Sequence, residues 1–107
     1  MPGKKPILFL VGIAYKDPAQ ETEFNRWYEE IHIPEVRRAI PGMTKVTRYK
    51  ATDREGPQFL AIYELRDEKV LQDFLSLRER QQRGEIHAFT PGPPYDVVLR
   101  KAFRPIS

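Results

Sequence analysis

Two short runs of this chain carry apolar side chains on both of their alternating faces, and they restrict the fold more than any other feature. The first, from about Pro6 to Ala14, reads Pro-Ile-Leu-Phe-Leu-Val-Gly-Ile-Ala, and the second, Gln58 to Leu65, reads Gln-Phe-Leu-Ala-Ile-Tyr-Glu-Leu. Both are rich in branched and aromatic residues and too short for a typical helix, which predicts β-strands. Glu64 is the main polar exception. Both faces of the resulting sheet therefore carry apolar side chains that must be shielded from water.

A helical repeat follows the first run. We expect this helix to begin near residues 19–22, to kink at Pro34, which has no N–H to donate, and to continue to Ala39. Its apolar stripe at i, i+3, i+4 and i+7 consists of Phe24, Trp27, Tyr28 and Ile31. His32 therefore stands beside an aromatic stripe at the point where the helix breaks.

A second helix is predicted between an N-cap at Asp67 and a C-terminal glycine at Gly84. Its apolar residues are Val70, Leu71, Phe74, Leu77 and Leu75. Residues 43–51 and 95–103 read as half-exposed strands. The order βαββαβ predicts one α+β domain over residues 1–107, a ferredoxin-like four-stranded antiparallel sheet with both helices on one face.

Two helices cover only one face, so the other face keeps the second set of apolar side chains from both buried runs. At about 25 cal/mol per Å², leaving this surface in water is costly. The simplest cover is a second copy of the chain packed sheet to sheet about a two-fold axis. The sequence therefore predicts a homodimer.

Composition narrows the functional classes. The 107 residues contain no cysteine and carry a net charge of +3, with basic and acidic residues interleaved, which does not favour nucleic acid. The apolar run near the N-terminus lacks a signal-peptide cleavage site and is too short to span a membrane, so we expect a cytoplasmic protein that does not insert in one. No phosphate-binding glycine motif and no zinc-like ligand spacing is found, so we expect neither a cofactor nor a metal.

The pattern Trp27-Tyr28-x-x-x-His32-Ile33-Pro34, followed by Pro41-Gly42 and then Arg48-Tyr49, resembles the EthD-like proteins of the dimeric α+β barrel superfamily. In that superfamily two ferredoxin-like sheets close on one another. Its members include cofactor-independent cyclases, muconolactone isomerases, hydroxynitrile lyases, quinol-type monooxygenases and haem-binding proteins. The resemblance implies a small-molecule pocket between helices and sheet, without naming a reaction.

His32 is the candidate for general acid–base catalysis, because an imidazole can take or give a proton near neutral pH. The alternative is that it caps the broken helix by donating to a freed carbonyl of Tyr28 or Glu29. Trp27 is predicted to lie in the helix-to-sheet core. His87 is expected in a surface segment.

Four further residues are candidates for binding the substrate: Tyr28, Arg48, Tyr49 and Glu64. Tyr28 lies one turn before His32, Tyr49 could orient a carbonyl or phenol, and Arg48 could hold a carboxylate. Arg48 could instead be an exposed edge charge. Glu64 would gain a raised pKa if a dimer buried its face of the sheet, or would lie in solvent at the strand end.

These residues lead to a first hypothesis of a cofactor-independent lyase, isomerase or cyclase that acts on an apolar oxygenated or aromatic compound through His32. The alternative is a non-catalytic binding or accessory protein with the same cavity. A haem-handling protein with a histidine ligand, or a monooxygenase, is a third possibility.

Overall fold

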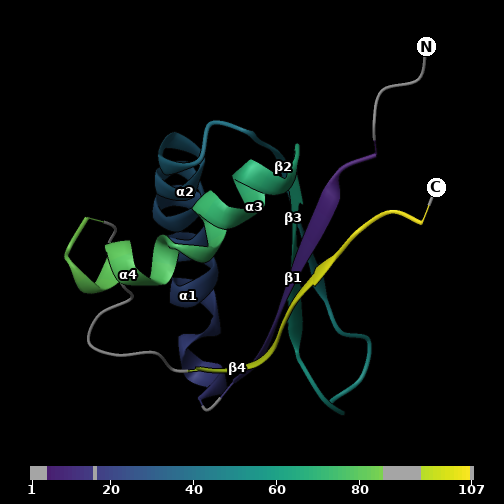
Figure 1. The fold of residues 1–107 in the computed structure, drawn as a ribbon. Helices are drawn as coiled ribbons and strands as arrows, with labels where there is room; N and C mark the ends of the chain where they lie inside the picture. Colours follow the sequence, from purple (N-terminus) through teal and green to yellow (C-terminus); the bar gives the residue numbers. More distant parts are fainter. Residues whose placement is uncertain (1–4, 16, 86–94, 107) are drawn as a thin grey trace.

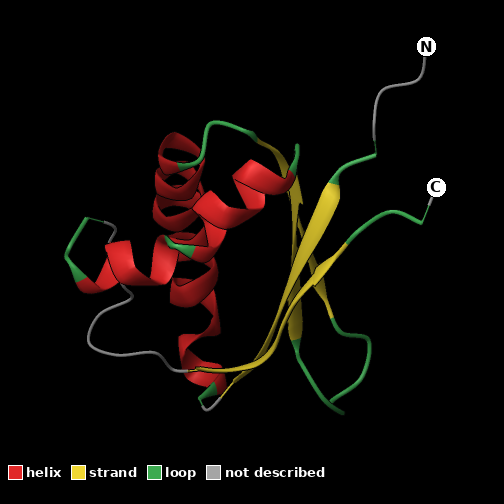
Figure 2. Cartoon of the chain, in the orientation of Figure 1, coloured by secondary structure: helices red, strands yellow, loops and turns green. Residues whose placement is uncertain are grey.

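The computed structural model describes residues 5–15, 17–85 and 95–106. Its elements in chain order are β1 Ile7–Tyr15, a 3₁₀ turn Pro18–Gln20, α1 Glu21–Trp27, a π-helical turn Tyr28–His32, α2 Ile33–Ala39, β2 Met43–Lys50, β3 Phe59–Leu65, α3 Glu68–Leu75, α4 Leu77–Gln82 and β4 Tyr95–Phe103. The helices form one layer against one face of the sheet, and the other face is left without helices (Figures 1 and 2). This is the predicted ferredoxin-like α+β architecture.

The four strands are antiparallel and lie in the order β2-β3-β1-β4. The two apolar runs are thus the central pair, which explains why they are apolar on both faces. The more polar strands β2 and β4, which the sequence predicts as half exposed, form the edges. A register shift between Gly12 and Ile13 marks a β-bulge where β1 pairs with β4.

The first helical segment changes just before the kink predicted at Pro34, in a π-helical turn that the sequence did not predict. The five residues Tyr28–His32 form a π-helical turn, in which the Ile33 N–H donates to the Tyr28 carbonyl. Pro34 falls in the first turn of α2, where a missing N–H is harmless, so it opens the new helix.

The π-helical turn also changes which side chains face the sheet. Ile31, predicted in the apolar stripe, is 45% exposed, whereas Ile33 is 9% exposed and belongs to the core. The inward position after Tyr28 is reached after five residues because a π-helical turn is wider than an α-helical one. The prediction that Ile31 faces the sheet was therefore wrong, because the π-helical turn moves the inward-facing position to Ile33.

The second predicted helix is two short helices, with the break at Ser76. Asp67 caps α3, its carboxylate accepting from the Val70 N–H at 3.0 Å. Ser76 Oγ donates to the Asp73 carbonyl at 2.6 Å, where α3 ends. Leu75 is 44% exposed, so its place in the apolar stripe was wrong. Gly84 has φ +80°, which fits its predicted role after the last helical residues.

The core fills the space between helices and sheet. Its buried members are Ile7, Phe9, Ile13, Phe59, Ala61, Tyr63 and Leu65 from the central strands β1 and β3, Met43 from the edge strand β2, and Phe24, Tyr28, Ile33, Val36, Ile40, Val70, Leu71 and Phe74 from the helical side. Gly42 allows close approach of the chain to α3, since a Cβ there would lie 2.2 Å from Val70 Cγ2.

The opposite face of the sheet carries Leu60 and Ile62 half-buried, with Tyr49 and Phe103 exposed at 56% and 42%. This is the apolar face for which the sequence predicts a second copy of the chain. The homodimer stays a prediction.

Candidate functional site

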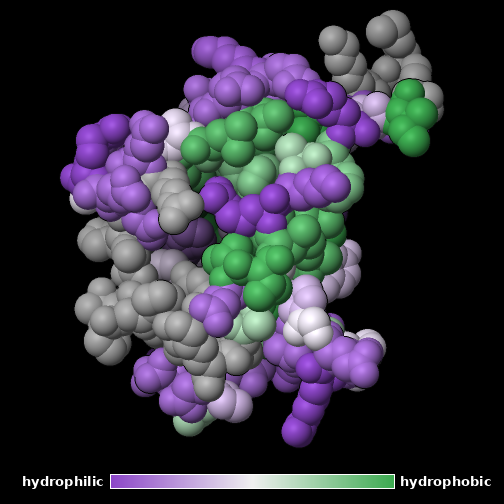
Figure 3. Space-filling view, turned by 60° about the horizontal axis from the view of Figure 1, so that its bottom comes forward, coloured by the Kyte–Doolittle hydropathy of each residue, from purple (hydrophilic) through white to green (hydrophobic). Residues whose placement is uncertain are grey.

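A cavity of about 730 Å³ lies between the helical layer and the β4 side of the sheet. This volume is in the range of small-molecule sites. Its polar lining residues are Tyr28, His32, Tyr63, Gln81, Asp96 and Arg100, and the rest of the lining is largely apolar and aromatic. In the space-filling view, hydrophobic side chains gather in the middle of the visible face and a hydrophilic band crosses them (Figure 3).

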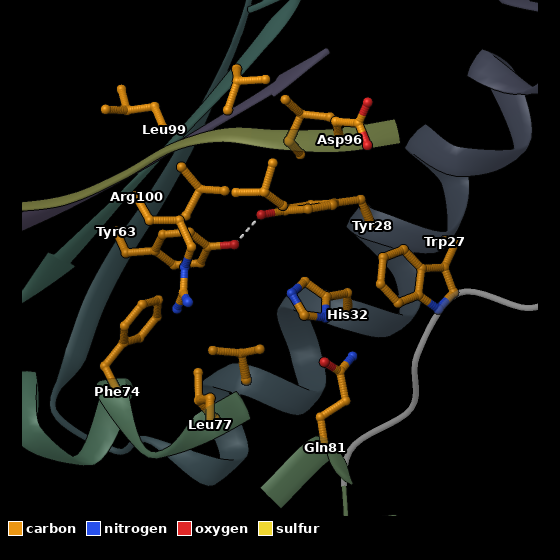
Figure 4. Close-up of a pocket in the computed structure, with 15 residues that line it drawn as sticks. Trp27, Tyr28, His32, Tyr63, Phe74, Leu77, Gln81, Asp96, Leu99 and Arg100 are labelled. Carbon is orange, nitrogen blue, oxygen red and sulfur yellow. Dashed lines mark hydrogen bonds between the residues drawn. The ribbon is translucent and has the colours of Figure 1, made fainter. Parts of the chain in front are cut away.

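The His32 ring turns into this cavity (Figure 4). It stacks on Trp27, with ring centroids 4.8 Å apart at 21°, and meets Tyr28 edge-on at 4.9 Å. Nδ1 is buried and has no hydrogen-bond partner within the described part of the chain. The alternative that His32 caps a freed helix carbonyl through Nδ1 is therefore wrong.

Burial lowers the pKa of His32 from 6.5 to about 4; the charge of Glu35 opposes this effect, and that of Arg48 adds to it. The imidazole is consequently neutral at pH 7 and keeps one lone pair for accepting a proton. In the described residues no carboxylate or carbonyl holds Nδ1, so the ring is positioned by stacking rather than by a hydrogen bond.

Two tyrosine hydroxyls meet at the wall of the cavity. Tyr28 comes from the π-helical turn and Tyr63 from β3, and their hydroxyl oxygens are hydrogen-bonded to each other (Figure 4). Both rings are nearly fully buried, at 4% and 2% exposure. A pair of phenols in an apolar wall can donate to a ligand oxygen more strongly than in water.

Arg48 lies behind Tyr28 rather than in the cavity. It faces the helices from β2, is 11% exposed, and donates to Asn25 Oδ1 at 2.8 Å and Glu29 Oε1 at 3.2 Å. Its guanidinium lies 4.3 Å from the centroid of the Tyr28 ring. The interpretation of Arg48 as an exposed edge charge is wrong, and this side chain holds Tyr28 in place.

Tyr49 and Glu64 do not line the cavity around His32. Tyr49 pairs with Leu60, and Glu64 follows Ile62 by two residues, so all four share the face without helices. Glu64 lines a separate depression with Thr44 and Arg66 among its neighbours. A substrate-binding role for Tyr49 and Glu64 stays a prediction that this cavity does not support.

The structure thus unites His32 and Tyr28, and it adds residues that the sequence reasoning missed. Trp27, predicted as core, also lines the cavity, and Tyr63 and Arg100 join it from β3 and β4. Tyr63 lies on the same face of its strand as Phe59 and Ala61. A tyrosine hydroxyl among these inward-facing apolar residues could therefore have been recognised as a candidate for the site. Arg100 carried none, because the register of β4 was unknown. His87 lies outside the described residues.

Across the described ranges, no group of three or more His, Cys, Asp or Glu residues is arranged to hold a metal ion. Those same ranges contain no helix long and apolar enough to cross a membrane.

No protein-family profile matches the chain, and a search of curated proteins finds no match. Solved structures do match. HapK from Hahella chejuensis is 14% identical with a TM-score of 0.61, over 94% of this chain and 92% of its own. A monooxygenase from the gene ActVA-Orf6 of Streptomyces coelicolor, in complex with nanaomycin D, is 16% identical with a TM-score of 0.59, over 96% and 89%.

An EthD family protein from Bacillus halodurans is 16% identical over 75% of this chain and 90% of its own, with a TM-score of 0.49. The likeness to the first two structures covers nearly the whole chain and confirms the ferredoxin-like α+β fold that the sequence resemblance implied.

Proposed function

We propose that the cavity binds an apolar oxygenated or aromatic small molecule and that His32 moves a proton on it, in an isomerase, lyase or cyclase type of step that needs no cofactor. The observation that carries the proposal is the His32 ring, which enters a cavity of ligand size without being tied to the helix. The hydroxyls of Tyr28 and Tyr63, which are hydrogen-bonded to each other, lie in the same wall, where one hydroxyl of the pair can donate to a ligand oxygen.

A carbonyl compound fits this arrangement. With its oxygen at the hydroxyl pair of Tyr28 and Tyr63, the His32 imidazole takes a proton from the carbon beside the carbonyl. The electron pair of the broken C–H bond moves to the carbonyl oxygen and gives an enolate, which the donating hydroxyl of the pair stabilises. The imidazolium, whose N–H proton exchanges with solvent, then returns a proton at the same carbon or at another.

The lowered pKa of His32 suits a base that must be unprotonated at pH 7. A pKa of about 4 makes the free imidazole a weak base, but the enolate formed beside it favours the imidazolium, since an opposite charge within about 4–6 Å raises a pKa. General acid–base catalysis of this kind contributes about 10²–10⁴-fold to a rate.

The fold comparison supports a small-molecule ligand, because a monooxygenase of the same fold holds nanaomycin D. A binding protein without catalysis is the second candidate. It is favoured by one observation, that nothing in the described residues orients His32 through Nδ1 as catalytic histidines are commonly oriented.

The two candidates differ in the response to His32→Phe, which keeps a ring to stack on Trp27 and removes both nitrogens. We would incubate the protein with a panel of aryl ketones and aromatic β-keto acids in D₂O and follow exchange of the hydrogens beside the carbonyl by NMR. The enzyme proposal predicts exchange with at least one compound that is about a hundredfold faster than with His32→Phe. Binding without any difference in exchange would leave the non-catalytic candidate.

A further inference from the structure

Arg100 belongs to the cavity but not to the proton transfer described above. It pairs with Val11 across the β1–β4 ladder, which places its side chain on the helix-facing side of the sheet. Its guanidinium lies 5.5 Å from the centroid of the Phe9 ring. Figure 4 shows the side chain reaching from β4 past Tyr63 toward the space between Phe74 and His32. Although exposed, it is therefore aimed at the cavity mouth rather than along the strand.

The charge of Arg100 is not neutralised by an acidic side chain of the described residues. Within the described part of the chain it forms no ion pair, whereas Arg48, also on the helix-facing side, is bonded to Glu29 and Asn25. Among the described lining residues it is the one arginine or lysine, and Asp96 is the one acid. Asp96 lies four residues along β4, roughly 13 Å at about 3.3 Å per residue, toward the other end of the cavity (Figure 4).

We propose that this cavity is suited to an aromatic anion, a ring system that bears a carboxylate or a similarly charged oxygen group, and that the Arg100 guanidinium binds this group at the mouth. A planar guanidinium can hold such a group through two parallel hydrogen bonds. The aromatic walls formed by Trp27, Tyr28 and Phe74 accept the rings.

An anion fixed at Arg100 would orient the rest of the ligand. Figure 4 shows the guanidinium and the Tyr63 hydroxyl directed into the same part of the cavity, with His32 across from them. A ligand anchored at Arg100 therefore extends toward the imidazole. This inference rests on the proposed function for the identity of the cavity as the ligand site, and it does not depend on catalysis.

The test uses two fluorescent probes with the same aromatic framework. 8-Anilinonaphthalene-1-sulfonate carries a negative charge, and N-phenyl-1-naphthylamine is the same compound without the sulfonate. We expect Arg100→Gln to weaken binding of the anionic probe at least about tenfold and to leave the neutral probe within about twofold, because a hydrogen bond to a charged group is lost only for the anion. Arg100→Lys, which keeps the charge but not the fork, should lose less.

Lys101→Gln is the matched control. It removes the same charge from the neighbouring residue of β4, which pairs with Leu10 and so faces away from the helices. Equal losses of the anionic probe in Arg100→Gln and Lys101→Gln would reduce the effect to net charge and overturn the proposal, as would no loss in either.

Leu77→Trp, which fills the cavity from α4, separates this inference from the proposed function. Neutral-probe binding that survives Leu77→Trp in a folded protein, or absence of binding by either probe, would count against the cavity as the ligand site and so against both proposals. Neutral-probe binding that Leu77→Trp abolishes, combined with an anionic probe indifferent to Arg100→Gln, would overturn the role of Arg100 alone. Probe selectivity that depends on Arg100 while no ketone exchanges would support this inference and contradict only the catalysis.

Discussion

The buried histidine should make the stability of this protein depend on pH in a way that one substitution removes. His32 has a pKa of about 4 in the folded chain against 6.5 when unfolded, so between these values the unfolded state binds more protons. Stability contributed by the neutral ring is therefore full above pH 6.5, falls as the pH drops through this window, and is lost below pH 4. The whole shift corresponds to about 3 kcal/mol at about 1.36 kcal/mol per unit, of which about 2.5 kcal/mol is lost between pH 8 and pH 4.5.

The assay is the free energy of unfolding by urea from pH 4.5 to pH 8, measured on the wild-type chain and on His32→Phe. Phenylalanine keeps the ring contact with Trp27 and cannot take a proton, so the carboxylates of the chain titrate alike in both proteins and cancel in the difference. We expect this difference to change by about 2.5 kcal/mol across the range, with the wild type losing more at low pH. Parallel profiles would contradict this prediction, because they would mean that His32 is solvated or paired in the folded state.

Three further predictions concern the surroundings of the site. Arg48→Met removes the contacts behind Tyr28, which are one hydrogen bond, a partly exposed ion pair and a cation–π contact. It should lower the free energy of unfolding by about 2 kcal/mol in urea titrations. A change below about 0.5 kcal/mol would show that the Arg48 side chain contributes little to stability. Gly42→Ala should cost about 1–3 kcal/mol, since its Cβ would meet Val70 Cγ2 at 2.2 Å, and an unchanged melting temperature would contradict this. Sedimentation equilibrium should give about twice the chain mass of 12.6 kDa for the wild type and the single mass for Ile62→Lys on the open sheet face, whereas a monomeric wild type would dismiss the homodimer.

The fold was predictable because its strongest signals are local. Apolar runs such as Ile7–Ala14 and the stop at Pro41-Gly42 specify strands, helices and their order, and the connection rules leave few arrangements for that order. Phase was harder. A periodicity of 3.6 residues assigns Ile31 to the core, and only the extra residue of the π-helical turn moves that place to Ile33. No sequence signal announced that turn.

The site was predictable in part for the same reason. His32 and Tyr28 lie four residues apart on one helical segment, so local reasoning could join them. Tyr63 and Arg100 reach the cavity through strand register, which depends on pairing between segments far apart in the chain. Arg48 was ambiguous because strand parity alone does not say which face of an edge strand turns to the helices.

Whether the neutral His32 imidazole takes a proton from a ligand in this cavity can be measured through the pH dependence of the second-order rate constant for ligand proton exchange. This quantity reports the pKa of the base in the free protein. We predict a rate that depends on His32, rises with pH through about pH 4, and stays level across pH 6.5. An inflection near pH 6.5, or an exchange rate that survives in His32→Phe, would contradict it.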